Sequence, residues 1–148
     1  MTLALHPNNE MVAVAWIKAM LDITSVATTL PDKESWGEDG FVQVSNVGGE
    51  SNIYVPMREP ILSIDCWGWS ANSAKPPWNQ ANNLAEAIRM ASFDYDNAGR
   101  LLSLPGSYPD ARVKSVYLTQ EPRRVPDDAG SFAHYQFDMY CGWIEIPA

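Results

Sequence analysis

The segment that most constrains the fold is the end of the chain, where two β-rich runs flank a turn. "RVKSVYLTQEPRRV" covers residues 112–125 and "SFAHYQFDMYCGWIEI" covers 131–146. The "PDDAG" between them contains the Asp and Gly residues that are typical of turns. Sixteen extended residues would span roughly 50 Å, whereas a usual strand has about five or six residues. We therefore expect a long C-terminal β-hairpin that either bends or projects beyond the domain.

Alternation of apolar and polar residues divides these strands into two faces. In the last run one face carries Ala133, Tyr135, Phe137, Met139, Cys141 and Trp143, and the other carries His134, Gln136, Asp138 and Tyr140. Residues 61–68 repeat the pattern, with Leu62, Ile64 and Cys66 opposite Ser63 and Asp65. Such alternation is typical of half-buried strands.

Two segments show helical spacing. "NNEMVAVAWIKAMLD" (8–22) predicts a helix that Asn8 or Asn9 can cap. Its apolar positions nearly surround it: Val12, Ala15, Trp16 and Ala19, widened by Met11, Val14, Ile17 and Met20. Such a helix needs cover on more than one side, from its own sheet or from a neighbouring chain.

The second helix is predicted to begin at Pro76 and Pro77, because proline is favourable in a first helical turn. Its expected buried stripe consists of Ala81, Leu84, Ala85, Ile88 and Ala91.

The remaining segments complete the expected fold. Strands are predicted over 23–30 and 41–47, the second ending at the glycines that follow it, and residues 48–60 are predicted to form an extended arm or loop. Residues 95–111 form a long connection with turn signals. The order α-β-β-β-α-β-β predicts an α/β fold of the α+β type, one mixed or antiparallel sheet flanked by helices. We expect residues 1–148 to form a single domain.

Charge and composition narrow the classes of function. The 148 residues carry a net charge of −8, which argues against a protein that wraps nucleic acid. There is no apolar run of about 18 residues and no basic, then apolar, N-terminal signal. Two cysteines are too few for a disulfide scaffold. We expect folding in the cytoplasm and no membrane partner.

The sequence offers no convincing catalytic arrangement. Phosphate-binding glycine motifs and a GxSxG motif are absent. Cys66 and His134 are predicted on opposite faces of their strands, so a thiolate pair is disfavoured, and buried thiols usually behave as small hydrophobes. The cysteines and histidines lack zinc spacing. Clustered carboxylates lie in loops, where they are mostly solvated: Glu34, Glu38, Asp39, Asp127 and Asp128. We expect no catalytic residues, metal or cofactor.

Tryptophans around one loop are the unusual feature. Trp67, Trp69 and Trp78 lie in "CWGWSANSAKPPW", and aromatic residues in loops are favoured at protein contacts. Alternatively, they form a second small core on the far face of the sheet. Stacking on single-stranded nucleic acid is a third reading, for which this loop offers only Lys75 as a cation.

Taken together, "ILSIDCWGW", the following "KPPW…A…LAEAI" and the hairpin phrase "EPRRVPDDAG…YQFDMY" resemble the tail terminator proteins of long-tailed (siphovirus-type) phages, especially those of actinobacterial hosts. The resemblance covers essentially the whole chain.

It implies a structural virion protein that forms a hexameric ring, caps the tail tube, stops its growth and joins the tail to the head connector. The implied partners are further copies of the chain, the major tail tube protein, the head–tail connector or stopper protein, and DNA passing through the lumen without specific binding. The implied location is the tail or neck of the virion, after assembly in the host cytoplasm. An acidic lumen would repel DNA phosphates.

Candidate contact residues lie in three segments: Arg58 and Glu59 in the arm, Trp69 and Trp78 in the tryptophan loop, and Arg123, Arg124, Asp127 and Asp128 at the hairpin tip. Three alternatives remain open. They are another neck protein, such as a stopper or head-completion protein; a small enzyme using Cys66 or the loop carboxylates; and a monomeric binding module.

Overall fold

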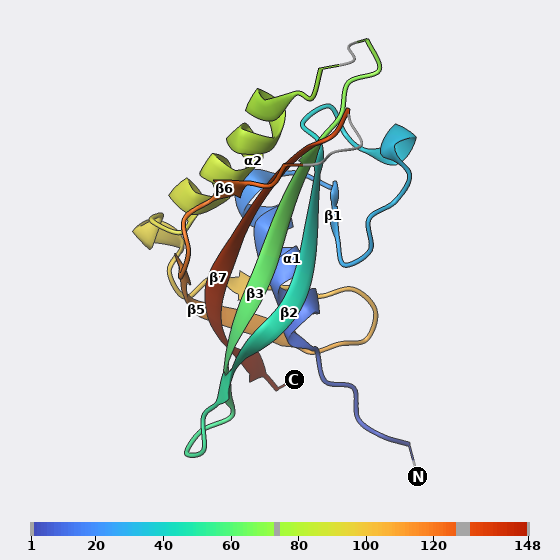
Figure 1. Ribbon diagram of the computed structural model, residues 1–148. Coiled ribbons are helices and arrows are strands. Elements are labelled where there is room, and N and C mark those ends of the chain that lie inside the picture. Colours follow the sequence, from blue (N-terminus) through green and yellow to red (C-terminus); the bar gives the residue numbers. More distant parts are fainter. Residues whose placement is uncertain (1, 73–74, 127–130, 148) are drawn as a thin grey trace.

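The computed structural model describes residues 2–72, 75–126 and 131–147. In these ranges two α-helices pack on one face of a curled, seven-stranded mixed sheet (Figure 1). The expected α+β fold and its element order are confirmed, with two short strands added.

Helix α1 spans Asn9–Leu21 and helix α2 spans Trp78–Ala91. The strands are β1 (Val26–Ala27), β2 (Phe41–Ser51), β3 (Met57–Gly68), β4 (Leu101–Leu102), β5 (Asp110–Leu118), β6 (Arg123–Arg124) and β7 (Ala133–Ile146). Two short 3₁₀ turns, η1 (Lys33–Ser35) and η2 (Tyr95–Asn97), lie in the connections.

The sheet has the strand order β1-β2-β3-β7-β5-β4, and β6 pairs with β7 beyond the end of β5. β1 runs parallel to β2, and the other neighbouring strands are antiparallel. β7 is central and pairs along its length with β3. It bends strongly (Figure 1). The predicted C-terminal hairpin is therefore present, and its long strand bends with the sheet.

Helix α1 begins where the sequence indicates. The Asn8 side chain accepts a hydrogen bond of 2.8 Å from the backbone N–H of Met11. Asp22 ends the helix in the left-handed conformation, with φ of 54°. The next residue, Asn9, fixes the helix to the sheet, because its side-chain oxygen accepts a hydrogen bond of 3.0 Å from the Trp143 indole.

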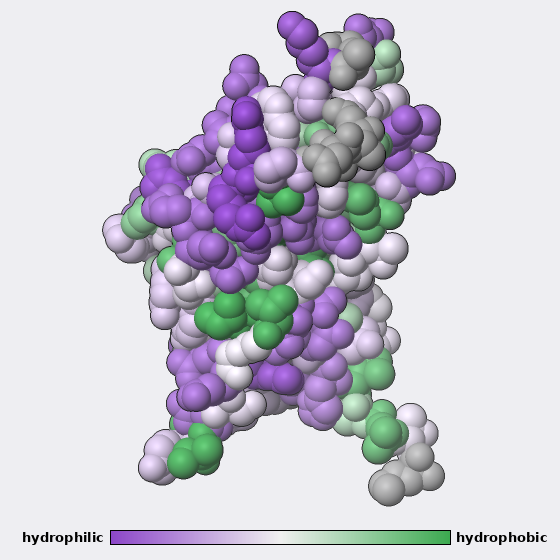
Figure 2. All heavy atoms as spheres, in the orientation of Figure 1, coloured by the Kyte–Doolittle hydropathy of each residue, from purple (hydrophilic) through white to green (hydrophobic). Residues whose placement is uncertain are grey.

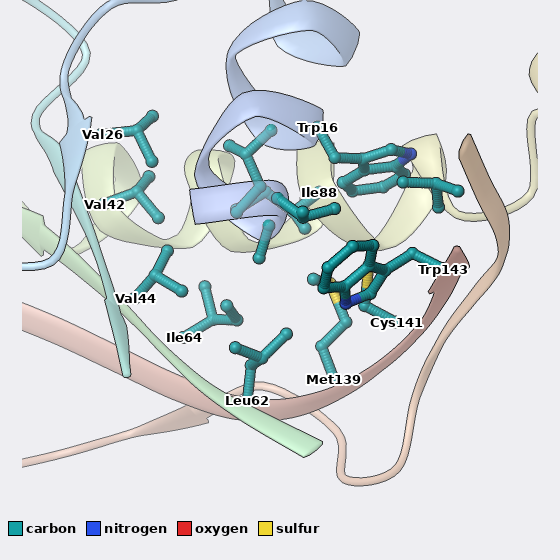
Figure 3. Packing of buried hydrophobic residues seen from close by; sticks show 14 of the residues in the cluster. Trp16, Val26, Val42, Val44, Leu62, Ile64, Ile88, Met139, Cys141 and Trp143 are labelled. Carbon is teal, nitrogen blue, oxygen red and sulfur yellow. The ribbon is translucent and has the colours of Figure 1, made fainter. Parts of the chain in front are cut away.

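The core lies between the helices and the inner face of the sheet (Figure 3). All predicted inward residues of β3 are fully buried, as are Phe137, Met139 and Cys141 of β7. Both helices contribute their predicted stripes, including Trp16 and Ile88. Ala13, which the predicted stripe of α1 omitted, is fully buried, whereas Ala15 and Ala19 are only half-buried. Ala91, at the end of α2, is also half-buried.

The largest difference from prediction concerns residues 48–60. β2 does not end at its glycines: a bulge between Asn46 and Gly48 lets the strand continue to Ser51. Gly49 has φ of 103°, and a Cβ there would strike the Glu59 carbonyl oxygen across the ladder. The predicted arm is thus the distal end of the β2–β3 hairpin, which extends beyond the body (Figure 1). We call residues 52–56 the arm tip.

Smaller boundaries also differ. The strand predicted over 23–30 contains only the two residues of β1. The connection over 95–111 contains η2 and β4, and β5 begins within it at Asp110. The strand predicted over 112–125 ends as β5 at Leu118: Thr119 still donates a backbone hydrogen bond of 2.9 Å to Asp138, the following "QEP" does not pair, and pairing resumes at β6. In the described residues no helix is long and apolar enough to cross a membrane.

Candidate assembly surfaces

The outer face of the sheet, which no helix covers, carries a polar network along β3 and β7. The register places Trp67 opposite His134 and Asp65 opposite Gln136. The His134 Nε2 and Asp65 Oδ1 atoms are 2.6 Å apart, and the His134 ring stacks on Trp67 with centroids 3.9 Å apart. Gln136 donates to Asp138 at 2.9 Å and to the Ser63 hydroxyl at 3.1 Å. These contacts hold the two strands together from the solvent side.

An aromatic cluster continues from this network at the start of β2. Trp36 contacts Phe41, Trp67 and Phe132, with ring centroids between 5.7 and 6.5 Å apart. The Trp36 indole N–H donates to the carbonyl of Pro31 at 3.0 Å. The segment around η1 is therefore folded over the outer face. This geometry favours the second-core interpretation for Trp67.

The other two loop tryptophans lie against cations from distant segments. Lys33 Nζ is 4.7 Å from the centroid of the Trp69 ring, and the Arg124 guanidinium is 4.0 Å from that of Trp78. Trp78 also meets Tyr135 edge to face at 6.2 Å. Beyond Lys75, the cation within the loop itself, the fold brings Lys33 and Arg124 from distant segments to these rings. These intramolecular contacts compete with base stacking.

The arm residues predicted as contacts are tied to β7. Tyr140 donates a hydrogen bond of 2.8 Å to Glu59 Oε1. Burial and the neighbouring Glu59 carboxylate raise the pKa of the Tyr140 phenol to about 12. The Arg58 guanidinium lies 5.7 Å from the Trp143 ring centroid, and its side chain is exposed. Arg58 and Glu59 therefore brace the base of the arm.

The remaining predicted contacts lie near β6. Arg123 is exposed, and its Nε donates to Gln136 Oε1 at 3.2 Å. Asp127 and Asp128 lie outside the described residues. The structure thus brings Trp78 and Arg124 together beside β7 and places Arg123 against Gln136 on the outer face. Arg58 and Glu59 lie at the other end of the sheet.

Sequence reasoning missed the apolar arm tip. Ile53, Tyr54 and Val55 are 84%, 88% and 48% exposed. The available signal was three consecutive apolar residues in an otherwise polar segment, between Asn52 and Pro56.

The geometry opposes the catalytic alternatives. Cys66 is fully buried on the inner face, whereas His134 lies on the outer face against Trp67. The Ser63 hydroxyl donates weakly to Asp65 at 3.5 Å, and Asp65 separates it from His134. A serine nucleophile needs the histidine next to it, with the carboxylate behind, so this order is unsuitable. In the described residues no group of three His, Cys, Asp or Glu side chains could hold a metal ion.

Both thiols are expected to be unreactive in the folded protein. Burial raises the pKa of Cys141 to about 12, and burial together with the Asp65 charge raises that of Cys66 still further. The thiolate fraction is therefore negligible at pH 8. A maleimide should label neither cysteine within hours in native buffer and both after denaturation in urea, measured by mass spectrometry. Rapid native labelling of Cys66 would revive the thiol-enzyme alternative.

Comparison with known proteins identifies a structural likeness but no family. No protein-family model matches the chain, and neither does any curated protein. Among solved structures, a chain from the virion of a native gene transfer agent particle superposes with a TM-score of 0.51. The match covers 90% of this chain and 88% of that chain, at 14% sequence identity. At this identity the likeness establishes a shared fold.

Proposed function

We propose that this protein is a structural component of a virion. The observation that carries the proposal is the shared fold with a chain from a gene transfer agent virion, over nearly the full length of both chains. Two features of the described residues support it. They present no nucleophile or metal arrangement suited to catalysis, and they expose an apolar arm tip that a monomer does not need.

More specifically, we propose a tail terminator. In this role six copies form a ring on the last ring of the tail tube, stop its growth and present a docking surface to the head connector. The support is the sequence resemblance of the β3, α2 and C-terminal hairpin phrases. The projecting β2–β3 hairpin and the partly uncovered α1 helix also suit a subunit that contacts neighbours.

The proposal assigns separate roles to the candidate contacts. Arg58 and Glu59 stiffen the base of the arm that reaches the next subunit. Trp78 and Arg124 form a surface beside β7 for a ring neighbour or the tube, and Trp69 lies in the loop leading to it. Arg123 offers a separate contact on the outer face, beside Gln136. Exposed ion pairs contribute only about 0–1 kcal/mol each, so apolar burial must dominate ring cohesion.

Passage of DNA is the last element of the proposal. The net charge of −8 would keep phosphates from adhering to the lumen wall. The test is charge reversal at Asp127 and Asp128, two of the predicted hairpin-tip contacts, which lie outside the described residues. Replacing both with lysine should slow DNA ejection, and unchanged ejection would count against an acidic lumen.

Tube growth tests the terminator role. Purified protein added to polymerising tail-tube subunits of the same virus should stop elongation and leave caps at one end, seen by negative-stain microscopy. Bovine serum albumin at equal concentration is the control. Tubes of unchanged length would refute the terminator role, and binding to the connector alone would favour a stopper protein.

A further inference from the structure

The arm tip is a fixed, exposed apolar projection. The side-chain oxygen of Asn52 accepts hydrogen bonds from the backbone N–H groups of Tyr54 at 2.8 Å and Val55 at 3.2 Å. The Asn52 backbone N–H also bonds to the Met57 carbonyl at 3.4 Å, closing the hairpin. This turn holds Ile53, Tyr54 and Val55 in solvent, and Figure 2 shows hydrophobic colour at this far end of the hairpin, at the lower left. A pre-shaped tip loses little entropy on binding.

A complementary apolar groove lies along α1. It has a volume of about 720 Å³, and helix α1, β1 with Thr28, and the segment after β4 line it. Its α1 residues are Met11, Val14, Ala15, Lys18 and Ala19. Apart from Lys18, these are side chains of the predicted wide apolar stripe that the sheet does not cover. Small residues at the centre leave room for an inserted side chain.

The tip cannot reach the groove of its own chain. β1, at one end of the groove, pairs with Val42, and the tip begins at Asn52, ten residues or roughly 30 Å farther along the hairpin. The other end, at Met11, follows Glu10, which contacts Asn46, and from Asn46 the hairpin still runs six residues, roughly 20 Å, before the tip. Figure 1 agrees, with the arm tip at the lower left and β1 on the opposite side.

Charge favours another copy as the occupant. Lys18 is the charged residue among those lining the groove, and Glu50 is the exposed carboxylate two residues before the tip. Glu50 also faces Glu59 across the ladder, and a cation from a neighbouring subunit would reduce the repulsion between these two carboxylates. Neither Lys18 nor Glu50 has a side-chain partner among the described residues.

We propose that the arm tip of one copy inserts into the α1 groove of a second copy, with Tyr54 seated over Ala15 and Ala19 and Glu50 near Lys18. Tip and groove are different surfaces, so the contact is heterologous and can close into a ring. A few tip residues bury less than the roughly 1,200–2,000 Å² of a stable interface. The contact between two copies is therefore weak, but repeated around a closed ring the contacts together stabilise the assembly. This inference rests on the proposed ring-forming function and identifies its contact.

Disulfide trapping tests the contact. Tyr54→Cys and Ala19→Cys variants are prepared separately, mixed at high concentration and oxidised mildly. Because native Cys66 and Cys141 are fully buried, a new disulfide reports only the introduced pair. We expect a covalent heterodimer from the mixture and none from either variant alone. The control uses a Tyr95→Cys variant in place of the Tyr54→Cys variant. Tyr95 is also exposed but lies on η2.

A charge substitution supplies the second measurement. Tyr54→Asp should weaken self-association by at least about tenfold in sedimentation equilibrium, whereas Tyr95→Asp should leave it unchanged. Circular dichroism should show both variants folded, since both side chains are exposed. Trapping no better than the control, or Tyr54→Asp assembling normally, would overturn the contact. If the contact fails these tests but the protein still caps tubes, the terminator role stands without this contact. If the disulfide forms but the protein does not cap tubes, the contact stands and the terminator role is refuted.

Discussion

Replacing Trp143 with alanine should lower the free energy of unfolding by about 3–5 kcal/mol, measured by urea denaturation. The side chain is 1% exposed and lies among the inner faces of β7, α1 and α2. Its indole N–H bonds to Asn9 at 3.0 Å, and Arg58 lies over its ring. One residue therefore joins the core, the start of α1 and the base of the arm. The alanine variant loses all three connections and leaves a cavity.

The phenylalanine variant separates packing from hydrogen bonding. Trp143→Phe keeps much of the buried ring and loses the bond to Asn9, so we expect a loss of about 1–2 kcal/mol. Asn9→Ala, which removes only the acceptor, should cost about 1–3 kcal/mol because the buried indole N–H is left unpaired. Equal losses for Trp143→Ala and Trp143→Phe would show that packing around this side chain contributes little.

Gly40→Ala is expected to lower the free energy of unfolding by about 2–5 kcal/mol, combining backbone strain with overpacking. Gly40 has φ of 96°, a conformation that alanine rarely adopts. A Cβ there would collide with the backbone carbonyl oxygen of Trp67 and approach Leu84 Cδ1 to 3.2 Å. Because the obstacle is backbone of a central strand, β2 and β3 must separate to relieve it.

The matched control is Gly48→Ala, within the strand β2 that Gly40 immediately precedes. Gly48 is exposed, and a Cβ there would meet nothing within 4 Å. We expect a change within about 0.5 kcal/mol. If both alanine variants unfold at the same urea concentration, the backbone geometry described for Gly40 is incorrect.

Local patterns identified the elements whose residues alternate or repeat clearly. The period of two in β3 and β7 assigned inner and outer faces, and the stripe of α2 matched its buried residues except for the half-buried Ala91. The glycine pair after β2 misled the prediction because glycine signals both chain reversal and a bulge. Only the cross-strand pairing of Gly49 with Pro60 distinguishes the two.

The surfaces depend on register, which a single sequence does not contain. Nothing local indicates that Trp67 pairs with His134, or that η1 brings Lys33 to Trp69. The excess apolar surface of α1 was visible in the sequence, and it is this surface that forms the groove. Its proposed occupant, the arm tip, was hidden in a segment interpreted as irregular.

We propose that this chain is a ring-forming component of the neck of a virion. Cryo-electron microscopy of purified particles tests it most directly, using a particle whose copy of this protein carries a small C-terminal tag detected with a gold label. We predict ring-shaped density between tail tube and head connector, with label at that position and the β2–β3 hairpin reaching the adjacent subunit. Particles that contain none of this protein, or label elsewhere on the virion, would contradict the account.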